Sequence, residues 1–421
     1  MWGIQSKLAI LTVMALTSIV AAKDYNLSPT QYSMSEDANR VSSLESELPT
    51  LFQQSDPQQC LKLLLAHLNV SEHSQVLVFS KSSEQNRYIS PRSPRAIYFS
   101  EDFYLGYVPG GMMELIAADD PVGLKFYTFD PRVKHDERKV RRDNSCLRCH
   151  ANARTRDVPG VLVRSLSTES DGHLDLLGDT YLTKPSSPIE QRWGGWYVTG
   201  RHGDSVHMGN QFSDLGQAAE KAMNLDSLEG IVDLSGYLQT TSDIVSLMVL
   251  EHQVAIHNLL SAVRMELARA EFLTLALDPE QDLRSNLQIL SLERDYADKL
   301  LAAMMFVGEA PLPADGIDGN PSFAESFEAR GPRSEEGWSL YDLRLQKRMF
   351  KYRCSYMIYS KAFEFLPAPV KRLFFEKLQQ HLEGEGLEGL PSMSAREKSR
   401  VHAILAQTHP GYQAFLASSN E

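Results

Sequence analysis

The chain has 421 residues, of which 43% are hydrophobic and 23% charged, and this is the composition of a globular protein. Its length predicts two or three domains rather than one ordinary core. The formal net charge of −12 argues against nucleic-acid binding, and no apolar run reaches the roughly 20 residues that a membrane-spanning helix needs.

The first 22 residues have the pattern of a secretory signal peptide. Lys7 supplies a positive charge, residues 8–22 are largely apolar, and residues 20–22 are small enough for cleavage. We therefore predict a signal peptide over residues 1–22 and a mature protein that starts at Lys23 and is periplasmic or otherwise exported. An uncleaved membrane anchor is the alternative, which the short, polar-interrupted run disfavours.

Residues 23–55 are polar and lack periodicity, which predicts a loose N-terminal arm. A helix is expected to begin at Asp56-Pro57, since proline is favoured in the first turn. Runs of aromatic and β-branched residues between turn residues then predict an antiparallel meander. These runs cover residues 76–79, 96–99, 103–108 and 124–129, and two further strands are predicted over residues 161–165 and 193–199.

From about residue 236 the apolar residues recur at helical spacing. Thr241 or Ser242 can cap a long helix that is predicted to end near Leu275. Further helices are predicted over residues 279–307, 340–365, 370–382 and 395–407, and an acidic loop over residues 309–337. The sequence thus predicts an α+β protein, with a mixed antiparallel-sheet domain over residues 56–235 and an all-helical domain over residues 236–421.

One motif carries recognisable chemistry, and it lies in the first of these domains. Cys146-Leu147-Arg148-Cys149-His150 has the spacing that attaches haem c covalently, with two thioether bonds to the porphyrin and the adjacent imidazole on the iron. A zinc site would need a fourth ligand and usually a second Cys pair, which the chain does not have, and a thioredoxin-like motif would need a βαβ context. We therefore predict one covalent haem c, bound by Cys146, Cys149 and His150, whose iron is coordinated by His150.

The motif resembles that of the c-type cytochromes. Longer stretches are similar to a group of exported bacterial proteins described as cytochrome c domain-containing. These stretches are Ile89-Ser90-Pro91, Pro94-Arg95-Ala96-Ile97-Tyr98-Phe99, Cys146 to His150, Val158-Pro159-Gly160, Arg192-Trp193-Gly194-Gly195-Trp196-Tyr197-Val198-Thr199-Gly200 and Cys354-Ser355-Tyr356. The resemblance implies haem binding and electron transfer, and it supplies no substrate.

The ligand opposite His150 would decide what such a haem does, because a strong second ligand favours electron transfer and an open site permits small molecules to bind. Residues 201–210 hold two histidines and a methionine among small residues. We predict that this distal ligand comes from here, with His207 ahead of His202 and Met208.

Other candidates for the distal ligand are weaker. His252 and His257 lie five residues apart on the predicted long helix and therefore do not share a face. His135 lies in a charged loop and is expected to be exposed. Met112 and Met113 follow a glycine turn and are expected in the core.

Cations crowd the segment around the motif, where they either form a solvated basic loop or neutralise haem propionates and steer an acidic partner. They are Arg132, Lys134, Arg138, Lys139, Arg141, Arg142, Arg148, Arg154 and Arg156. Of Trp193 and Trp196, one is expected in the core and the other in the haem pocket. Cys60 and Cys354 are expected either as two buried thiols or as a disulfide.

Together these features predict an exported single-haem cytochrome that transfers electrons to redox protein partners. It is expected to bind no nucleic acid and to have no membrane span after signal cleavage. Residues 132–156 could provide weak docking to a partner, and an electron carrier is favoured over an enzyme. Two alternatives stay open: a haem enzyme or a gas or redox sensor with an open distal site, and a partner-binding protein whose haem is structural.

Overall fold

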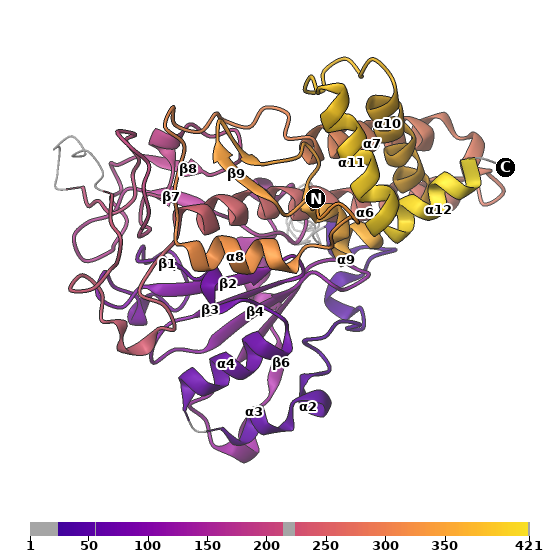
Figure 1. The fold of residues 1–421 in the computed structure, drawn as a ribbon. Helices are drawn as coiled ribbons and strands as arrows, with labels where there is room; N and C mark the ends of the chain where they lie inside the picture. The colour runs from indigo at the N-terminus through magenta and orange to yellow at the C-terminus, as the bar shows by residue number, and fades with distance from the viewer. Residues whose placement is uncertain (1–23, 55, 214–223, 420–421) are drawn as a thin grey trace, which may run out of the picture.

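A computed structural model describes residues 24–54, 56–213 and 224–419. The predicted signal peptide lies outside these residues. The described chain forms a central antiparallel sheet with helices on both faces and further helices at its C-terminal end (Figure 1). This confirms the predicted α+β class.

The central sheet has six strands in the order β1-β2-β3-β4-β5-β6, so each strand pairs with the next along the chain. Leu115 stands opposite Leu105 on one side and Tyr127 on the other. The predicted meander is therefore confirmed, and it contains two strands, β4 and β6, that the sequence did not reveal. The strands are β1 (Val76–Val78), β2 (Arg95–Ser100), β3 (Phe103–Tyr107), β4 (Met113–Ala117), β5 (Lys125–Phe129) and β6 (Val140–Arg142).

Each face of the sheet packs against different helices. The short helices α2 (Leu44–Glu47) and α3 (Pro49–Gln53) and the longer α4 (Pro57–His67) cover one face, at the bottom of Figure 1. Helix α4 begins where predicted, and Asp56 caps it by accepting a hydrogen bond from Gln58 N at 3.0 Å. Because side chains alternate along a strand, Leu105 packs on this side whereas Tyr104 packs on the other.

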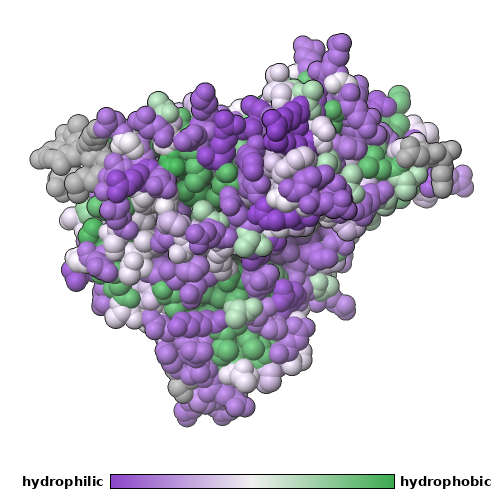
Figure 2. All heavy atoms as spheres, in the orientation of Figure 1, coloured by the Kyte–Doolittle hydropathy of each residue, from purple (hydrophilic) through white to green (hydrophobic). Residues whose placement is uncertain are grey.

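Helix α6 (Ile244–Leu277) packs against the opposite face of the sheet. Asp243 caps it by accepting a hydrogen bond from Ser246 N at 2.9 Å, one residue later than the predicted Ser242. Within the described chain this is the one helix long and apolar enough to cross a membrane, but 89% of its most apolar window is buried inside the protein. The outer face drawn in Figure 2 is mostly hydrophilic, with smaller apolar patches.

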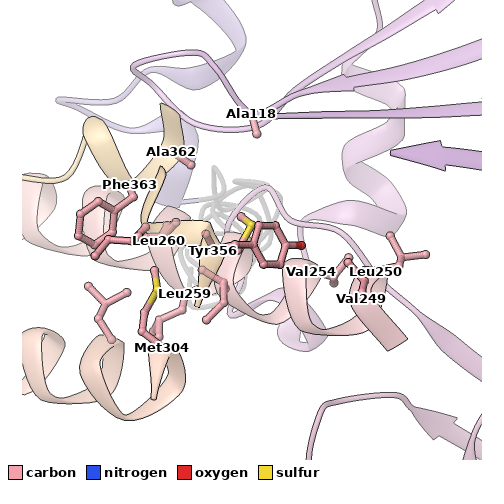
Figure 3. Close-up of a cluster of buried hydrophobic side chains, with 14 of the residues drawn as sticks. Ala118, Val249, Leu250, Val254, Leu259, Leu260, Met304, Tyr356, Ala362 and Phe363 are labelled. Carbon is pink, nitrogen blue, oxygen red and sulfur yellow. The ribbon is translucent and has the colours of Figure 1, made fainter. Parts of the chain in front are cut away.

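The remaining helices extend the core around α6. Leu259 and Leu260 of α6 lie beside Met304 and Phe363, which belong to α7 and α9 (Figure 3). One cluster of buried side chains contains these residues together with Trp196 from the first half of the chain. The predicted boundary near residue 236 therefore does not divide the core. The elements are α7 (Leu287–Met304), α8 (Pro321–Arg330), α9 (Lys361–Glu364), α10 (Ala368–Glu383), α11 (Ala395–Thr408) and α12 (Pro410–Ser419).

Two predicted segments are wrong because single residues have left-handed backbone conformations. Residues 340–365 form the hairpin β9 (Leu343–Gln346) and β10 (Arg348–Phe350) followed by shorter helices, since Leu345 and Lys347 have φ of 58° and 62°. Residues 193–199 do not form a continuous strand, since Trp193 and Gly195 have φ of 68° and 79° and make a turn, after which Trp196 and Thr199 form only isolated β-bridges.

The remaining differences concern helices, loops and cysteines. The predicted loop at residues 309–337 contains helix α8, and the helix predicted from residue 279 begins as α7 at Leu287. The predicted strand at residues 161–165 begins later, as β7 (Arg164–Leu166), and pairs with β8 (Thr180–Leu182). The predicted loose arm instead packs, with Val41 and Leu51 fully buried. Cys60 and Cys354 are free, buried thiols in separate clusters, so they form no disulfide.

Short 3-10 helices cover Asp24–Asn26, Tyr32–Met34, Glu72–Ser74, Asn86–Tyr88, His135–Glu137, Asn144–Cys146, Ala153–Thr155, Ile189–Gln191, Leu234–Gly236, Leu283–Ser285 and Tyr356–Tyr359.

Candidate cofactor site

The cysteine motif forms one helical turn, α5 (Leu147–His150), shortly after strand β6. Leu147 is buried and anchors this turn in the core, while Cys146 is half-buried and Cys149 is exposed. Residues three and four positions apart share a face of a helix, so Cys146, Cys149 and His150 lie on the same side. The backbone therefore presents both thiols and the imidazole together.

These side chains line a cavity of about 480 Å³, called the motif cavity below, which is within the size range of ligand sites. A narrower inner space of about 90 Å³ continues beside it, and Cys146 and His150 line both spaces. Strands β1, β2, β4 and β5 contribute one wall. Polar and charged side chains make up most of the lining of the motif cavity, whereas apolar side chains, several of them on these strands, line most of the inner space and a smaller part of the motif cavity. These apolar residues include Val78, Ile97, Leu162, Trp196, Ile116, Phe126 and Val163.

The orientation of His150 leaves one ring nitrogen free for a metal. Its Nδ1 lies 2.9 Å from the carbonyl oxygen of Gly160, which can only accept a hydrogen bond, so Nδ1 carries the proton. Nε2 then keeps its lone pair. Burial lowers the pKa of His150, and the ring is therefore neutral at pH 7. A neutral imidazole that donates through Nδ1 to a carbonyl is the usual state of a metal ligand.

A second set of contacts fixes Gly160 itself. Asn258 of α6 clamps the next residue, with its Oδ1 accepting from Val161 N and its Nδ2 donating to Val161 O, both at 2.8 Å. The amide of Gly160 donates to His150 O at 2.8 Å. A Cβ on Gly160 would lie 2.6 Å from Asn258 Oδ1 and 2.9 Å from Thr155, so a side chain does not fit there. The long helix thus positions the imidazole through the loop.

Cys146 lacks the property that a redox-active thiol needs. Burial, followed by the carboxylates of Asp143 and Glu114, raises the pKa of Cys146 to about 12. A redox-active Cys-x-x-Cys pair needs a lowered thiol pKa, because the thiolate is the nucleophile. Cys146 and Cys149 are both free. The thioredoxin-like interpretation is therefore unsupported.

An ion pair crosses the sheet beneath the motif. Arg95 of β2 and Glu114 of β4 meet at 2.6 Å, and both side chains line the motif cavity and the inner space. Gly106 of β3 stands opposite Glu114, and a Cβ there would collide with the guanidinium of Arg95. Because Gly106 has no side chain, the Arg95–Glu114 pair can span β3. One side of the cavity is therefore polar, but its two charges cancel.

Other arginines of the cavity differ in whether their charge is paired. Arg132 is held by both oxygens of Asp130, and Arg148 pairs with Glu84 at 2.7 Å. Arg154 and the half-buried Arg164 also line the cavity, and neither has an ion-pair partner in the described part of the chain. Burial, and then the charge of Arg154, lowers the pKa of Arg164. These two cations suit a bound anionic group.

Some cations of the basic segment have structural partners instead. Arg138 donates to the carbonyl oxygens of Pro131 and Val133, and Arg142 forms an ion pair with Asp37 at 3.0 Å. Neither residue lines the motif cavity. The segment is therefore divided between cations that tie loops together and cations that surround the cavity.

Both tryptophans belong to the main core cluster, and only Trp196 also borders the motif cavity. Trp196 lines the motif cavity, and its Nε1 donates to Arg164 O at 2.7 Å. Trp193 is fully buried, and its Nε1 donates to Glu251 Oε1 at 2.7 Å. The aromatic segment therefore supplies both residues to the core and one of them also to the cavity.

The structure does not bring the three predicted distal ligands into the motif cavity. His202 and His207 are buried against each other, with ring centroids 4.5 Å apart, and neither they nor Met208 lines it. Nδ1 of His207 accepts a hydrogen bond from Gly209 N at 3.0 Å, so the proton is on Nε2, where a metal would bind. Met208 accepts a hydrogen bond from Ser165 Oγ at 3.4 Å. Local chemistry thus disfavours His207 as a ligand.

The remaining histidine candidates have other partners. His252 contacts Ser355 Oγ at 2.7 Å and Glu309 at 3.1 Å, and His257 contacts Tyr104 OH at 2.6 Å. His135 is exposed, as expected. None of the three lines the motif cavity or the inner space.

The sequence revealed the motif but not what surrounds it. Gly160 lies in a stretch singled out by resemblance, although nothing local showed that its carbonyl would orient His150. Arg164 and Asn258 carried no signal, because their roles depend on contacts between distant segments. Comparisons with protein-family models, with curated proteins and with solved structures find no match to this chain.

Proposed function

We propose that this protein binds one covalent haem c through Cys146 and Cys149, with His150 as an axial iron ligand, and that it transfers electrons. The observation that carries the proposal is the state of His150. Its Nδ1 donates to Gly160 O and its Nε2 lone pair is free beside two thiols in one cavity. Neither a zinc site nor a redox disulfide accounts for that combination.

The residues around the motif fit such a group. The apolar side chains of Trp196, Ile97 and Leu162 would pack against the macrocycle, and the charges of Arg154 and Arg164 would neutralise its propionates. Asn258 and Gly160 would keep the imidazole oriented, as metal-ligating histidines are usually held by a second residue.

The bound haem would supply one-electron chemistry at its iron. The protein's own contribution is to exclude water on the core side, where Leu147 and Phe126 are buried, and to leave Cys149 exposed. An exposed attachment edge permits electron exchange with a partner without opening the fold. Partners would be redox proteins, and the arginines around the cavity favour an acidic docking surface.

Expression of the full chain with an export and haem-maturation system tests the proposal. The exported protein should stain for haem on a denaturing gel and change its absorption spectrum on reduction with dithionite. The Cys146→Ser/Cys149→Ser double variant should lose the stain, whereas Cys60→Ala, which removes a thiol outside the cavity, should keep it. A colourless wild-type protein, or equal staining of the double variant, contradicts the proposal.

The same preparation distinguishes the carrier from a haem enzyme or sensor. A low-spin, six-coordinate spectrum that carbon monoxide leaves unchanged supports electron transfer. A high-spin spectrum with ready carbon monoxide binding supports an open distal site instead. In that case haem attachment stands and the assignment to electron transfer is wrong.

A further inference from the structure

The lining of the motif cavity narrows the choice of a second axial ligand. Proteins ligate haem iron through His, Met, Cys or Tyr side chains. Outside the motif, the lining side chains of these types are Met112 and the tyrosines Tyr88, Tyr104 and Tyr127. Each tyrosine hydroxyl already bonds to a protein group, respectively Arg132, His257 and Asn39. Met112 is the remaining candidate, and no hydrogen bond to its sulfur occurs in the described part of the chain.

Strand alternation places Met112 on the cavity side of the sheet. Met113 and Leu115 are buried against α4 and its neighbours, on the opposite face. Glu114 and Ile116 lie between them in sequence and line the cavity or its inner space. Met112 immediately precedes β4, so its side chain lies on the same face as those of Glu114 and Ile116. The expectation that both methionines are core residues therefore holds for Met113 alone.

His150 and Met112 border different parts of the space. The ring of His150 packs on Phe126, with centroids 5.1 Å apart, and both residues line the inner space together with Ile116. Met112 lines only the outer cavity. Met112 and Ile116 are four positions apart along an extended chain, which corresponds to roughly 13 Å at about 3.3 Å per residue. The cavity thus extends between the imidazole and the thioether.

The backbone of Met112 is held in place by a buried amide. Gln85 is 5% exposed, and its Oε1 accepts from Met112 N at 2.7 Å while its Nε2 donates to Met112 O at 3.0 Å. A Cβ on Gly111 would lie 2.6 Å from Gln85 Oε1, so glycine is needed for this approach. Two such bonds fix the backbone, while the unbranched side chain keeps the freedom to reach its partner.

We propose that Met112 is the second axial ligand of the haem iron and that Gln85 is its positioning residue. This inference rests on the proposed haem attachment and deepens it. Thioether ligation closes the sixth coordination position and raises the reduction potential relative to two imidazoles, and both effects suit an electron carrier. It also replaces the ligand predicted from residues 201–210.

Adjacent methionines on opposite faces of one strand supply the test. Full-length, matured wild type, Met112→Leu, Met113→Leu and Met208→Leu are compared by haem-stained gel and by ferric absorption and magnetic circular dichroism. We expect all four to stain. Only Met112→Leu should lose the sulfur-to-iron charge-transfer band, become high-spin and bind carbon monoxide. Met112→His should restore a low-spin state at a lower reduction potential, and Gln85→Leu should weaken the band.

The unmodified protein gives a second readout. Labelling of the methionine methyl groups and NMR of the reduced form should show one methyl signal shifted strongly upfield by the porphyrin ring current, and this signal should disappear in Met112→Leu. Persistence of the charge-transfer band in Met112→Leu, its loss in Met208→Leu, or its absence from stained wild type overturns the Met112 assignment while haem attachment stands. Absence of the stain itself overturns both.

Discussion

Asn258 is a single residue through which the long helix controls the iron ligand. Its side chain makes both hydrogen bonds to Val161, next to the glycine that orients His150. Asn258→Leu leaves buried backbone groups without partners, which should cost about 1–3 kcal/mol of unfolding free energy. Without this contact, the imidazole of His150 can adopt more orientations, so the haem iron should show a broader distribution of spin states.

Denaturant unfolding and electron paramagnetic resonance of the matured protein measure these two effects. Ser261→Ala, on the next turn of α6, is the matched control because Ser261 makes no hydrogen bond to this loop. Equal stability and an unchanged spectrum in Asn258→Leu would show that the clamp does not position His150.

For single residues, the sequence predicts a site whose members are contiguous in the chain. It does not predict a site whose members are brought together from distant segments by folding. Cys146, Cys149 and His150 are contiguous, so their joint presentation follows from the geometry of one helical turn. Residues 201–210 have a suitable composition, but the tautomer of His207 depends on its bond to Gly209. Met112 was assigned to the core because a methionine after a glycine turn gives no local sign of the strand face on which it lies.

The N-terminus of α6 is a buried cap with a measurable pH dependence. Burial raises the pKa of Asp243 from 3.8 to about 6, although its hydrogen bonds from Asn320, Ser246 and Val245 oppose the shift. Because the folded state binds the proton more tightly than the unfolded chain, Asp243 adds stability that is complete below about pH 4. This stability is lost as the pH rises through about 6, and it amounts to at most about 3 kcal/mol.

Asp243→Asn keeps an amide oxygen that can cap the helix and removes the titration. Unfolding free energies of both proteins at pH 4.5 and pH 7 should therefore show a wild-type loss on raising the pH that exceeds the loss in the variant. Identical changes in the two proteins would mean that Asp243 titrates normally.

Regular elements were predictable where periodicity and caps agree. Helices α4, α10 and α11 begin within two residues of their predicted starts, since Asp56-Pro57 marks the first and the helical spacing of apolar residues marks the other two. Residues 340–365 were wrongly predicted as a helix because apolar residues that pack around Tyr356 imitate helical spacing. The left-handed conformations that break this segment have no signature in residue type, because Leu345 and Lys347 are neither glycine nor asparagine.

At the scale of the whole molecule, the site lies where the two predicted domains meet. The sheet provides Arg95 and Glu114, the motif loop provides His150, and α6 provides Asn258. Strand-like runs and helical spacing predicted the α+β class, but they could not show that one core unites both halves. The helical half therefore has a role that sequence left open, which is to support the loop that orients His150.

Charge around the cavity should set the rate of electron exchange with an acidic redox protein. Arg148 and Arg154 are exposed and line the cavity, while the chain as a whole carries −12. Reversing both to Glu should lower the second-order rate constant at low ionic strength by about 10-fold or more and weaken its salt dependence. The double variant Arg372→Glu/Arg396→Glu, on α10 and α11, changes the net charge by the same amount at residues that do not line the cavity, and it is the control.

Stopped-flow mixing of reduced protein with an oxidised acidic partner gives these rates. If the cavity and control reversals change the rate equally, then net charge, and not docking at the cavity, governs the exchange.

The central claim is the covalent bond between this motif and a porphyrin. Mass spectrometry of the mature, exported chain, intact and after proteolysis, measures it most directly. The mature chain should be heavier than the polypeptide by one haem, and the added mass should lie entirely on the peptide that contains Cys146, Cys149 and His150. A mature chain at the bare polypeptide mass, produced beside a functioning maturation system, would contradict that claim.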